Sequence, residues 1–330
     1  MTLVHLHFHG RRTGVTRHVE DVVRALSRAG AKAWGWGLGA DVPRSDFLTV
    51  WQTARRGGLV LHVHRNLELL LALSLRAVGK RVRVVWTRHS AKRPSRLTTL
   101  LASRADVRVT LTEEGARTLG LPSVVVTHGV DTLAFSVPKE RAAAWGALGV
   151  GGKYGLAVVG RIRPEKGQGD AVAALFLAFP DAPEWRGVLV GEARGADKAW
   201  LRTLLGPSPS NLVAVGEQAD VRPWYQGATV VVQPSHTESF SLVLLEAMAS
   251  GCCVVAANLP HYSAILEEGR TGFTYPVGQV EGLAAILKTL FAEPETAASV
   301  GRNAAQAVRS RFPLEREVTA LEQLYRGALR

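Results

Sequence analysis

The chain has 330 residues, of which 47% are apolar and 21% charged, and its formal net charge is +12. This composition is ordinary for a globular protein, and the length suits two domains with separate cores rather than a disordered or fibrous chain. No apolar run approaches the ~18 residues that a membrane span needs, so any membrane contact is expected to be peripheral.

Two features favour a cytoplasmic protein. The amino terminus begins with a strand-like M-T-L-V-H-L-H-F and lacks the basic-then-apolar order of an export signal. The two cysteines, Cys252 and Cys253, adjoin in an apolar segment and form neither a disulfide framework nor a metal site. Packing in a reducing compartment is their expected role.

Apolar strands that end in polar residues recur along the first half of the chain. The expected strands are Leu3–Phe8, Val60–His64, Val84–Ser90 and Val124–Asp131. Because helical stretches alternate with strands from end to end, the pattern favours an α/β fold with parallel sheets covered on both faces. Parallel strands deliver their polar residues to one edge of the sheet, where such folds bind ligands.

The segment Gly10–His18 follows the first strand and precedes a helix that is expected to run towards Gly30. Glycine in this loop, at Gly14, lets the backbone approach a ligand closely.

Histidines also lie at the strand ends, and such a histidine is more often a hydrogen-bonded structural residue than a catalytic one. Both interpretations stay open for the four of them, His62, His64, His89 and His128.

The excess of positive over negative charge lies in the first half of the chain. Residues 1–150 contain 23 Lys and Arg against 10 Asp and Glu, whereas residues 151–330 contain 17 against 18. The excess either keeps a solvated surface soluble or forms a landing surface for an anionic acceptor or membrane. The cations are densest in a basic region from Arg76 to Arg108, where Asp106 is the only acid. Nucleic-acid binding is disfavoured, because Trp86 is the only stacking ring in this region. Its cations are Arg76, Lys80, Arg81, Arg83, Arg88, Lys92, Arg93, Arg96, Arg104 and Arg108.

A glycine-rich stretch, Gly146–Tyr154, is the expected linker to a second domain. The strand after it leads into V-V-G-R-I-R-P-E-K-G, from Val158 to Gly167. An arginine and a lysine at a strand end, here Arg161 and Lys166, can clamp a diphosphate and stabilise it as a leaving group. An ordinary basic turn is the alternative.

Glu238 and Glu246 bracket the stretch E-S-F-S-L-V-L-L-E. A strand ending at residues 230–234 and a helix beginning near Ser239 would place Glu238 at the helix start and Glu246 about two turns inside. The helix is apolar on every side, which indicates burial, and a buried carboxylate must be hydrogen-bonded. Since a helix start favours phosphate, we interpret the glutamates as holding hydroxyls on either side of a diphosphate. Two glutamates on a solvated helix face are the alternative.

These motifs resemble those of a known family. The segment Gln233–Gly272 resembles the Glu-x7-Glu signature of the family 4 retaining glycosyltransferases, and Val158–Gly167 resembles their G-R-x-x-x-x-K-G loop. The segment Gly10–His18 is similar to their N-terminal glycine loop. The region from Val84 to Asp131 looks closest to lipopolysaccharide core mannosyltransferases, so the resemblance covers nearly the whole length.

The resemblance implies the GT-B fold, in which two doubly wound Rossmann-like domains face each other across a cleft that closes over the donor. The expected domains are an N-terminal acceptor-binding domain, residues 1–145, and a C-terminal nucleotide-sugar-binding domain, residues 155–312. The final segment, residues 313–330 with a helix at Leu314–Leu329, is expected to cross back to the first domain.

The resemblance also implies the roles of the site residues. Glu238 is placed against sugar hydroxyls, Glu246 against the ribose, Arg161 and Lys166 on the diphosphate, and His89 near the reacting sugar. Because the family pattern suggests attack by the acceptor from the front face, Glu238 is not assigned as a nucleophile. No metal and no cofactor are expected. The expected catalytic residues are Glu238, His89, Arg161 and Lys166, and the expected donor-binding residues are Gly14, Arg161, Lys166, Glu238, Ser239, Phe240, Ser241, Leu242 and Glu246.

The sequence departs from the family pattern at three places. Ser241 stands where glycine is frequent, and Cys252 or Cys253 stands where proline is frequent. Residues 258–263 replace paired glycines and a glutamate, so this loop gives no indication of the donor.

The implied function is that of a retaining hexosyltransferase acting on a nucleotide diphosphate sugar, with an anionic lipid-linked or lipopolysaccharide core saccharide as acceptor. Mannose is the first expected sugar, GDP-mannose the first expected donor and a UDP-hexose the second. The alternatives are a glucosyl, galactosyl or N-acetylglucosaminyl transferase that uses a UDP-sugar, a GT-B nucleotide-sugar epimerase, and a non-catalytic binding subunit. The protein is expected at the inner face of the cytoplasmic membrane, without a nucleic-acid partner.

Overall fold

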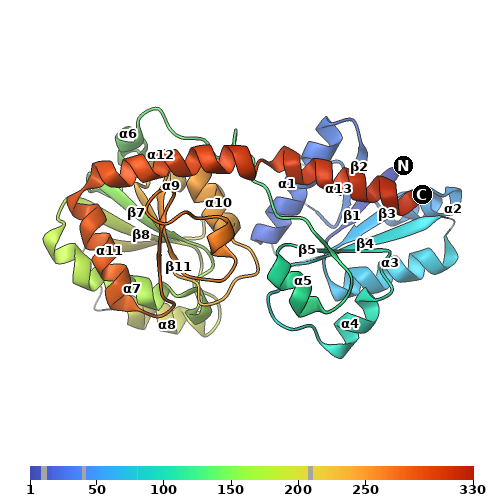
Figure 1. Cartoon of the computed structure of the whole chain (residues 1–330), viewed down its shortest axis with the longest axis horizontal. Helices are drawn as coiled ribbons and strands as arrows, with labels where there is room; N and C mark the ends of the chain where they lie inside the picture. Colours follow the sequence, from blue (N-terminus) through green and yellow to red (C-terminus); the bar gives the residue numbers. More distant parts are fainter. Residues whose placement is uncertain (9–12, 39–41, 80, 207–210) are drawn as a thin grey trace. The chain divides into compact units, whose positions relative to one another are not determined.

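The computed structural model describes residues 1–8, 13–38, 42–79, 81–206 and 211–330. The chain divides into two compact units: unit 1 comprises Met1–Gly129 with Leu314–Arg330, and unit 2 comprises Val130–Pro313. Within the described residues, each unit is built on a parallel six-stranded sheet with helices packed against it (Figure 1). The expected α/β fold with two sheets is therefore present.

Unit 1 combines the N-terminal strands and helices with the C-terminal helix, and its sheet has the strand order β2-β1-β3-β4-β5-β6. Its strands are β1 (Thr2–Leu6), β2 (Lys32–Trp36), β3 (Leu59–Val63), β4 (Val82–Arg88), β5 (Val107–Thr110) and β6 (Val124–Val125). Its helices are α1 (Gly14–Arg28), α2 (Phe47–Arg56), α3 (Asn66–Val78), α4 (Arg96–Ala102), α5 (Glu113–Leu119) and α13 (Leu314–Leu329).

The two faces of the unit 1 sheet bury separate cores, because successive strand residues point to opposite faces. From β1, Val4 and Leu6 pack with residues of α2 and α3, whereas Leu3 packs with residues of α1 and α13. Val318 and Leu321 of α13 are buried in this second core. The final helix thus belongs to the core of the N-terminal unit.

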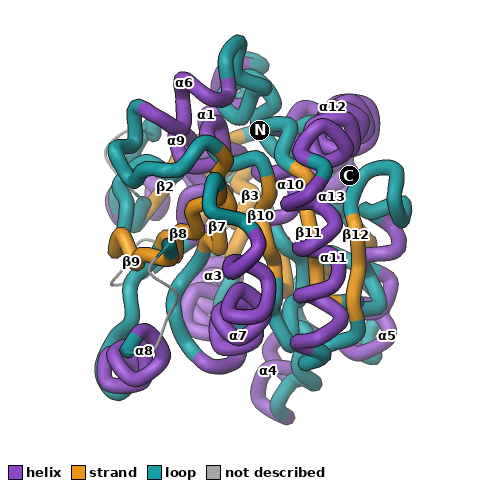
Figure 2. Tube along the Cα trace, turned by 90° about the vertical axis from the view of Figure 1, so that its left-hand side faces the viewer, coloured by secondary structure: helices purple, strands orange, loops and turns teal. Residues whose placement is uncertain are grey.

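Unit 2 repeats the architecture with the strand order β12-β11-β10-β7-β8-β9, and Figure 2 shows β10, β11 and β12 side by side. Its strands are β7 (Tyr154–Val159), β8 (Trp185–Val190), β9 (Leu212–Gly216), β10 (Val230–Gln233), β11 (Cys253–Ala257) and β12 (Phe273–Tyr275). Its α-helices are α6 (Arg141–Gly146), α7 (Gln168–Ala178), α8 (Asp197–Leu205), α9 (Arg222–Gly227), α10 (Leu242–Ala249), α11 (Val280–Ala292) and α12 (Pro294–Arg311). Short 3-10 helices are η1 (Pro164–Lys166), η2 (Phe179–Asp181) and η3 (Tyr262–Ala264).

The boundary between the units lies after Gly129, and residues 130–145 group with unit 2. The reason is local bonding: the Arg141 guanidinium donates to the carbonyl oxygens of Ser250 and Gly251 at 2.7 and 2.9 Å. Trp145 is 1% exposed, and its ring lies so close to Gly155 that a Cβ there would approach it to 2.3 Å. The glycine-rich stretch at residues 146–154 is accordingly a turn packed within unit 2 and not a linker between units.

The helix that carries Glu246 begins at Leu242 and not near Ser239 as expected. Ser241 is its N-cap, because the Ser241 hydroxyl accepts a hydrogen bond from the Leu244 amide at 3.2 Å. Glu238 therefore lies in the loop before the helix. Glu246 lies about one turn inside it, and not two.

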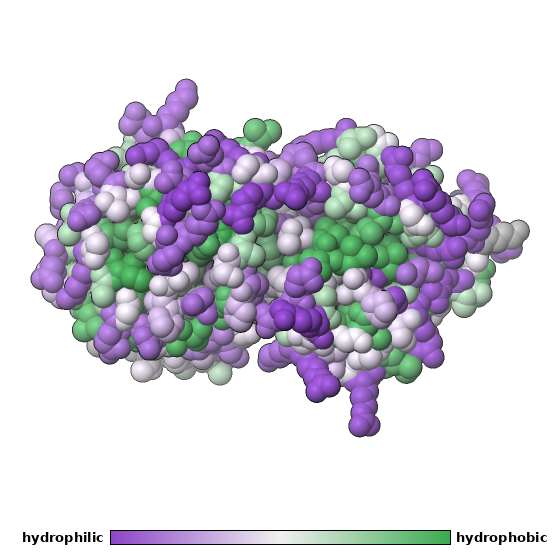
Figure 3. Space-filling model, viewed as in Figure 1, coloured by the Kyte–Doolittle hydropathy of each residue, from purple (hydrophilic) through white to green (hydrophobic). Residues whose placement is uncertain are grey.

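Among the residues that the structure describes, no helix is long and apolar enough to cross a membrane. Hydrophilic residues cover much of the face drawn in Figure 3, and hydrophobic residues form separate patches between them. Both cysteines are buried and not linked by a disulfide, as their expected packing role requires.

Candidate active site

The carboxyl edge of the unit 2 sheet has a switch point between β7 and β10. These strands are neighbours at the centre of the sheet, and the chain continues to β8 and β9 on one side and to β11 and β12 on the other. Loops diverge at such a point, which is where open α/β sheets bind ligands. Arg161 lies just after β7 and Glu238 just after β10. The two sequence motifs therefore meet at this edge.

The two motif loops touch at Gly167. This glycine has a φ of +70°, and a Cβ on it would lie 1.9 Å from the carbonyl oxygen of Pro234. The His236 amide also donates to the Glu165 carbonyl oxygen at 3.1 Å. Glycine is needed at this position because the neighbouring backbone comes too close for any side chain.

Glu238 is held by three side-chain donors. Lys166 forms an ion pair with Oε1 of Glu238, and the two side chains are 23% and 15% exposed. The Gln233 amide and the Ser235 hydroxyl donate to the same oxygen at 3.4 and 3.3 Å. Within the described residues every hydrogen bond to this carboxylate is made to Oε1, so Oε2 is available to a ligand.

Arg161 lies at the same edge but contacts a different acid. Its guanidinium is 3.5 Å from Oδ2 of Asp197, and its side chain is 49% exposed. The structure thus does not join Arg161 to the Lys166–Glu238 pair. Since an exposed ion pair contributes little, Arg161 can exchange Asp197 for an anionic ligand at small cost.

Glu246 lies on the partly exposed face of α10. Leu242, Val243 and Glu246 are partly exposed, whereas the other residues of the helix are buried. The Tyr225 hydroxyl donates to Oε2 of Glu246 at 2.9 Å. The carboxylate is consequently half-buried and hydrogen-bonded, as an otherwise apolar helix requires.

The loop before α10 has its own structural constraints. Ser241 replaces the frequent glycine of the family pattern, and its capping bond gives the serine a local role. Phe240 is 8% exposed, whereas Ser239 is only partly buried.

Tyr262 lies near Glu238. Burial, together with the negative charge of Glu238, raises the pKa of Tyr262 well above its ordinary value, so this hydroxyl stays neutral.

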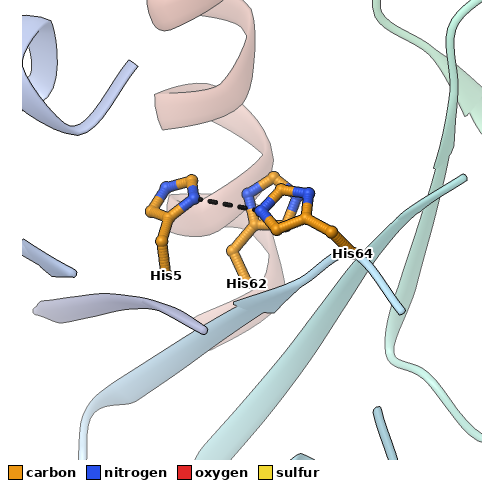
Figure 4. Close-up of side chains that lie close together, drawn as sticks. All are labelled: His5, His62 and His64. Carbon is orange, nitrogen blue, oxygen red and sulfur yellow. Dashed lines mark hydrogen bonds between the residues drawn. The ribbon is translucent and has the colours of Figure 1, made fainter. Parts of the chain in front are cut away.

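Unit 1 has a switch point between β1 and β3, and histidines gather there (Figure 4). His5 Nδ1 lies 3.4 Å from His64 Nε2. The two ring nitrogens of His62 are each 2.7 Å from a hydroxyl, one of Tyr325 and one of Thr87. These buried rings are therefore linked to each other and to α13 by hydrogen bonds.

His89 follows β4 and extends this network. Its Nε2 lies 3.0 Å from His64 Nδ1. Burial, followed by the neighbouring His128 and His18, lowers the pKa of His89 well below its ordinary value. The ring is therefore neutral near pH 7.

His128 has a structural role. Glu317 of α13 lies 3.0 Å from both His128 Nδ1 and His18 Nε2, and it accepts a hydrogen bond from the Gly129 amide at 2.7 Å. Although burial acts to raise the pKa of Glu317, the two histidines hold it well below its ordinary range. The carboxylate thereby fastens α13 to the end of the unit 1 sheet.

Two groups of buried side chains bring three potential metal ligands within 4.8 Å of one another. They are His5, His62 and His64, and His18, His128 and Glu317. In both groups the ligand atoms are already engaged in the hydrogen bonds described above. Hydrogen bonding among buried polar groups thus accounts for the close approach of these atoms.

Gly14 is the first residue of α1, and a Cβ there would meet no atom within 4 Å. The packing of the protein therefore does not itself require a glycine at this position. Thr13 caps the helix by accepting a hydrogen bond from the Thr16 amide at 3.2 Å. The rest of the expected glycine loop, residues 10–12, lies outside the described residues.

The ten cations between residues 76 and 108 do not form one uniform surface. Arg76, Arg83 and Arg108 are bonded to an aspartate or to backbone carbonyls. Arg88 is only 5% exposed, and Lys80 lies outside the described residues. The exposed members of the group are Arg81, Lys92, Arg93, Arg96 and Arg104.

Several residues that hold this geometry were not identified from the sequence. Gln233 and Ser235 carried a signal, since they are polar residues directly at a strand end. Tyr225 and Glu317 carried none, because their partners lie far away in the chain and are brought near only by packing.

Comparisons with known proteins agree with this organisation. A family model described as "Glycosyl transferases group 1" matches residues 153–293. The chain is 30% identical to the lipopolysaccharide core biosynthesis mannosyltransferase LpcC of Rhizobium leguminosarum bv. viciae, over 98% of this chain and 95% of the relative. It is 27% identical to the corresponding LpsB of Rhizobium meliloti, over 98% and 96%. The crystal structure of Anabaena Alr3699/HepE in complex with UDP-glucose matches with a TM-score of 0.86 at 20% identity, over 99% of this chain and 100% of that one.

The two parallel sheets and the structural match define the GT-B fold. The chain belongs to the group 1, or family 4, glycosyltransferases and is a retaining hexosyltransferase. The resemblance inferred from the Glu-x7-Glu and G-R-x-x-x-x-K-G motifs is thus confirmed.

We expect Gly167→Ala to separate the two motif loops. A Cβ would collide with Pro234, and relief of the collision moves Lys166 away from Glu238. Titration calorimetry with a nucleotide sugar should show donor affinity reduced by at least about tenfold, the loss expected for a charge-assisted contact. Gly269→Ala is the matched control, since Gly269 has nearly the same φ, +69°, but open space around it. Equal donor affinity in the two variants would contradict this account.

We also expect stability to fall as the pH is lowered from 7.5 to 5. Burial is the largest cause that lowers the pKa of five histidines, that of His5 to about 3. On unfolding each returns to about 6.5 and takes up a proton, so the stabilisation is complete above that pH and declines below it. The slope is up to about 1.4 kcal/mol per pH unit per histidine. A urea midpoint that is unchanged across this pH range would exclude the effect. The histidines concerned are His5, His62, His64, His89 and His128.

Proposed function

We propose that this enzyme transfers mannose from GDP-mannose, with retention of configuration, to an anionic saccharide of a lipopolysaccharide core or a related lipid-linked acceptor. The observation that carries the proposal is the similarity to two lipopolysaccharide core mannosyltransferases along 98% of the chain. The similarity includes unit 1, which is the unit expected to bind the acceptor. A match confined to the family motifs of unit 2 would support only the general class.

In the proposed donor site, the diphosphate lies at the switch point of unit 2. Lys166 and Arg161 bind its oxygens, and Glu238 accepts hydrogen bonds from sugar hydroxyls through Oε2. Glu246, fixed by Tyr225, holds the ribose. The loop at residues 239–242 completes the donor site of unit 2, and Gly14 of unit 1 is proposed as a further donor-binding residue.

The proposed chemistry needs stabilisation of a leaving diphosphate. Cleavage of the glycosidic bond places negative charge on the phosphate oxygens and oxocarbenium character on the sugar ring. Lys166 and Arg161 offset the first charge where it develops. We expect no metal in this role. The acceptor hydroxyl attacks the face from which the diphosphate departs, and a phosphate oxygen takes its proton.

His89 is proposed to bind the reacting sugar as a neutral hydrogen-bonding group. Its lowered pKa excludes a role as a cation near pH 7. The contact with His64 engages Nε2 and thereby fixes the orientation of the ring.

Replacement of Lys166 tests the donor site. Lys166→Met removes a phosphate contact and leaves Glu238 without its cation, so GDP-mannose affinity should fall by about 10- to 100-fold. A thermal-shift screen over nucleotide sugars provides the measurement, because a ligand of the native form raises the melting temperature. Lys153→Met is the control, since Lys153 is 59% exposed and its ion pair is with the exposed Glu184. Equal donor-induced shifts in both variants would refute the assignment.

The same screen, together with an activity assay, distinguishes the proposed mannosyltransferase from a UDP-hexose transferase, an epimerase and a binding subunit. A larger shift with UDP-glucose than with GDP-mannose would favour a transferase that uses a UDP-hexose, which is the ligand class in the HepE structure. Conversion of the nucleotide sugar without any acceptor would favour an epimerase. Tight donor binding without turnover would favour a binding subunit.

Peripheral contact with an anionic membrane is the second part of the proposal. Four leucines of α3 and α4 are more than half exposed, and Lys92, Arg93 and Arg96 lie exposed beside α4. Apolar side chains next to cations suit insertion at the surface of an acidic leaflet. The inner face of the cytoplasmic membrane is the proposed location. The leucines are Leu67, Leu70, Leu97 and Leu100.

Sedimentation with liposomes tests this contact. Wild-type protein should bind vesicles containing phosphatidylglycerol and should dissociate as salt is raised, because each cation contributes about 1 kcal/mol near the surface. The double variant Leu97→Ser, Leu100→Ser should bind several-fold less. Leu133→Ser in unit 2, where the leucine is 86% exposed, is the control. Equal binding to neutral and acidic vesicles would rule out the electrostatic part.

A further inference from the structure

Unit 1 contains a cavity of about 360 Å³ at the carboxyl ends of β3 and β4. Its walls come from the loop after β4, the starts of α3 and α4, and Val15 of α1. Figure 1 shows β4, α3 and α4 in the same part of unit 1. The position is next to the switch point between β1 and β3, where an open α/β sheet binds ligands.

The wall of the cavity is strongly basic. It includes four cations, and none of the residues described as lining it is acidic. The hydroxyls of Ser90, Ser95 and Thr98 add further hydrogen-bonding groups. A concave surface with only positive charge concentrates anions. The cations are Arg65, Arg88, Lys92 and Arg93.

Arg88 is the most informative of these cations. It is 5% exposed, and burial lowers its pKa from the ordinary value, yet a guanidinium remains charged. One nitrogen, Nη2, donates to the Lys92 carbonyl oxygen, whereas Nη1 is buried without a hydrogen-bond partner. Within the described residues no carboxylate forms an ion pair with Arg88. A buried and unpaired cation is costly, so its presence calls for an anion that the protein does not supply.

Trp86 provides a second unused donor on the same wall. It precedes Arg88 by two residues on β4, so both side chains point to the same face of the strand. Trp86 is 3% exposed, and its Nε1 has no hydrogen-bond partner. An indole nitrogen can only donate. Two unsatisfied donors on one face of β4 are complementary to the oxygens of a carboxylate or phosphate.

We propose that this cavity binds the acidic group, carboxylate or phosphate, of the saccharide that accepts the transferred sugar. The inference rests on the proposed function and adds to it the acceptor subsite and its chemistry. Arg88 and Trp86 donate to the anion, and Arg93 and Lys92 neutralise it. His89 and His64 line the same cavity, so an acceptor anchored here lies beside the histidine proposed to contact the reacting sugar.

Calorimetric titration of the full chain at low salt tests the proposal. The probes are glucuronic acid for the carboxylate, glucose 6-phosphate for the sugar phosphate, inorganic phosphate alone, and methyl glucoside as the neutral sugar. At least one acidic sugar should bind more tightly than both methyl glucoside and inorganic phosphate. Equal binding of acidic and neutral sugars, no binding of either acidic sugar, or equal binding of inorganic phosphate and the acidic sugars would overturn it.

Variants localise the binding. Arg88→Met should weaken the acidic sugar by about 10- to 100-fold. Because Arg88 forms no ion pair with a described carboxylate and only Nη2 is hydrogen-bonded, to the Lys92 carbonyl oxygen, the melting temperature without ligand should change little. A purely structural arginine would lower it. Arg93→Gln, at the exposed rim, should weaken binding several-fold and serves if the first variant does not fold. Arg117→Met, on exposed α5 and outside the cavity, should bind like wild type. Wild-type affinity in both Arg88→Met and Arg93→Gln would refute the site.

The increase in melting temperature with GDP-mannose distinguishes failure of the cavity proposal from failure of the proposed function. Both cavity variants should keep the full increase in melting temperature with GDP-mannose, because neither Arg88 nor Arg93 is among the residues proposed to bind the donor. A normal donor shift combined with no preference for acidic sugars would refute the cavity alone. Absence of any nucleotide-sugar shift in the wild type would refute the proposed function itself.

Discussion

The close approach of Gly167 to the carbonyl of Pro234 is the contact on which the site in unit 2 depends. Two loops that are separated by some seventy residues of sequence lie in van der Waals contact because one of them has no side chain at that point. Only then does Lys166 reach Glu238, and only then do Gln233 and Ser235 share the same carboxylate oxygen. The polar groups orient one another at the edge of a rigid sheet, so they are in position before any ligand arrives. Such preorganisation is what stabilisation of a leaving diphosphate requires.

The two units place their polar residues at the same topological position but use different residue types. In both sheets the polar residues gather at a switch point on the carboxyl edge. In unit 2 these residues are carboxylates and cations that remain partly exposed. In unit 1 histidines hydrogen-bond to one another, with Glu317 and Tyr325 of the C-terminal helix as further partners. The final helix is thus a structural part of the histidine network, and on the wall of the basic cavity Trp86 and Arg88 each have a buried donor without a hydrogen-bond partner.

Charge in the sequence and charge available at the surface are different quantities. The basic region of unit 1 contains ten cations in sequence, but hydrogen bonds to Asp106 and to backbone carbonyls occupy several of them. Among the described cations that remain, Arg96 is exposed beside the leucines of α4, Arg88 is buried in the wall of the cavity, and the exposed Lys92 and Arg93 belong to both surfaces. Arg88 differs from the others by its burial, because an ion pair or a confined anion is needed only where water is excluded.

The sequence by itself determined the α/β class and the family, and it supplied four residues of the proposed donor site. Periodicity and strand-end polarity are local, and the spacing of Glu238 from Glu246 and of Arg161 from Lys166 is read directly from the chain. Tertiary structure decided what depends on distant neighbours. The boundary after Gly129 follows from the bonds of Arg141, the helix start at Leu242 from the cap at Ser241, and the support of Glu246 from Tyr225. Sequence patterns report propensity and hydrophobicity along the chain, whereas hydrogen-bond satisfaction and close packing are properties of groups that only folding brings together.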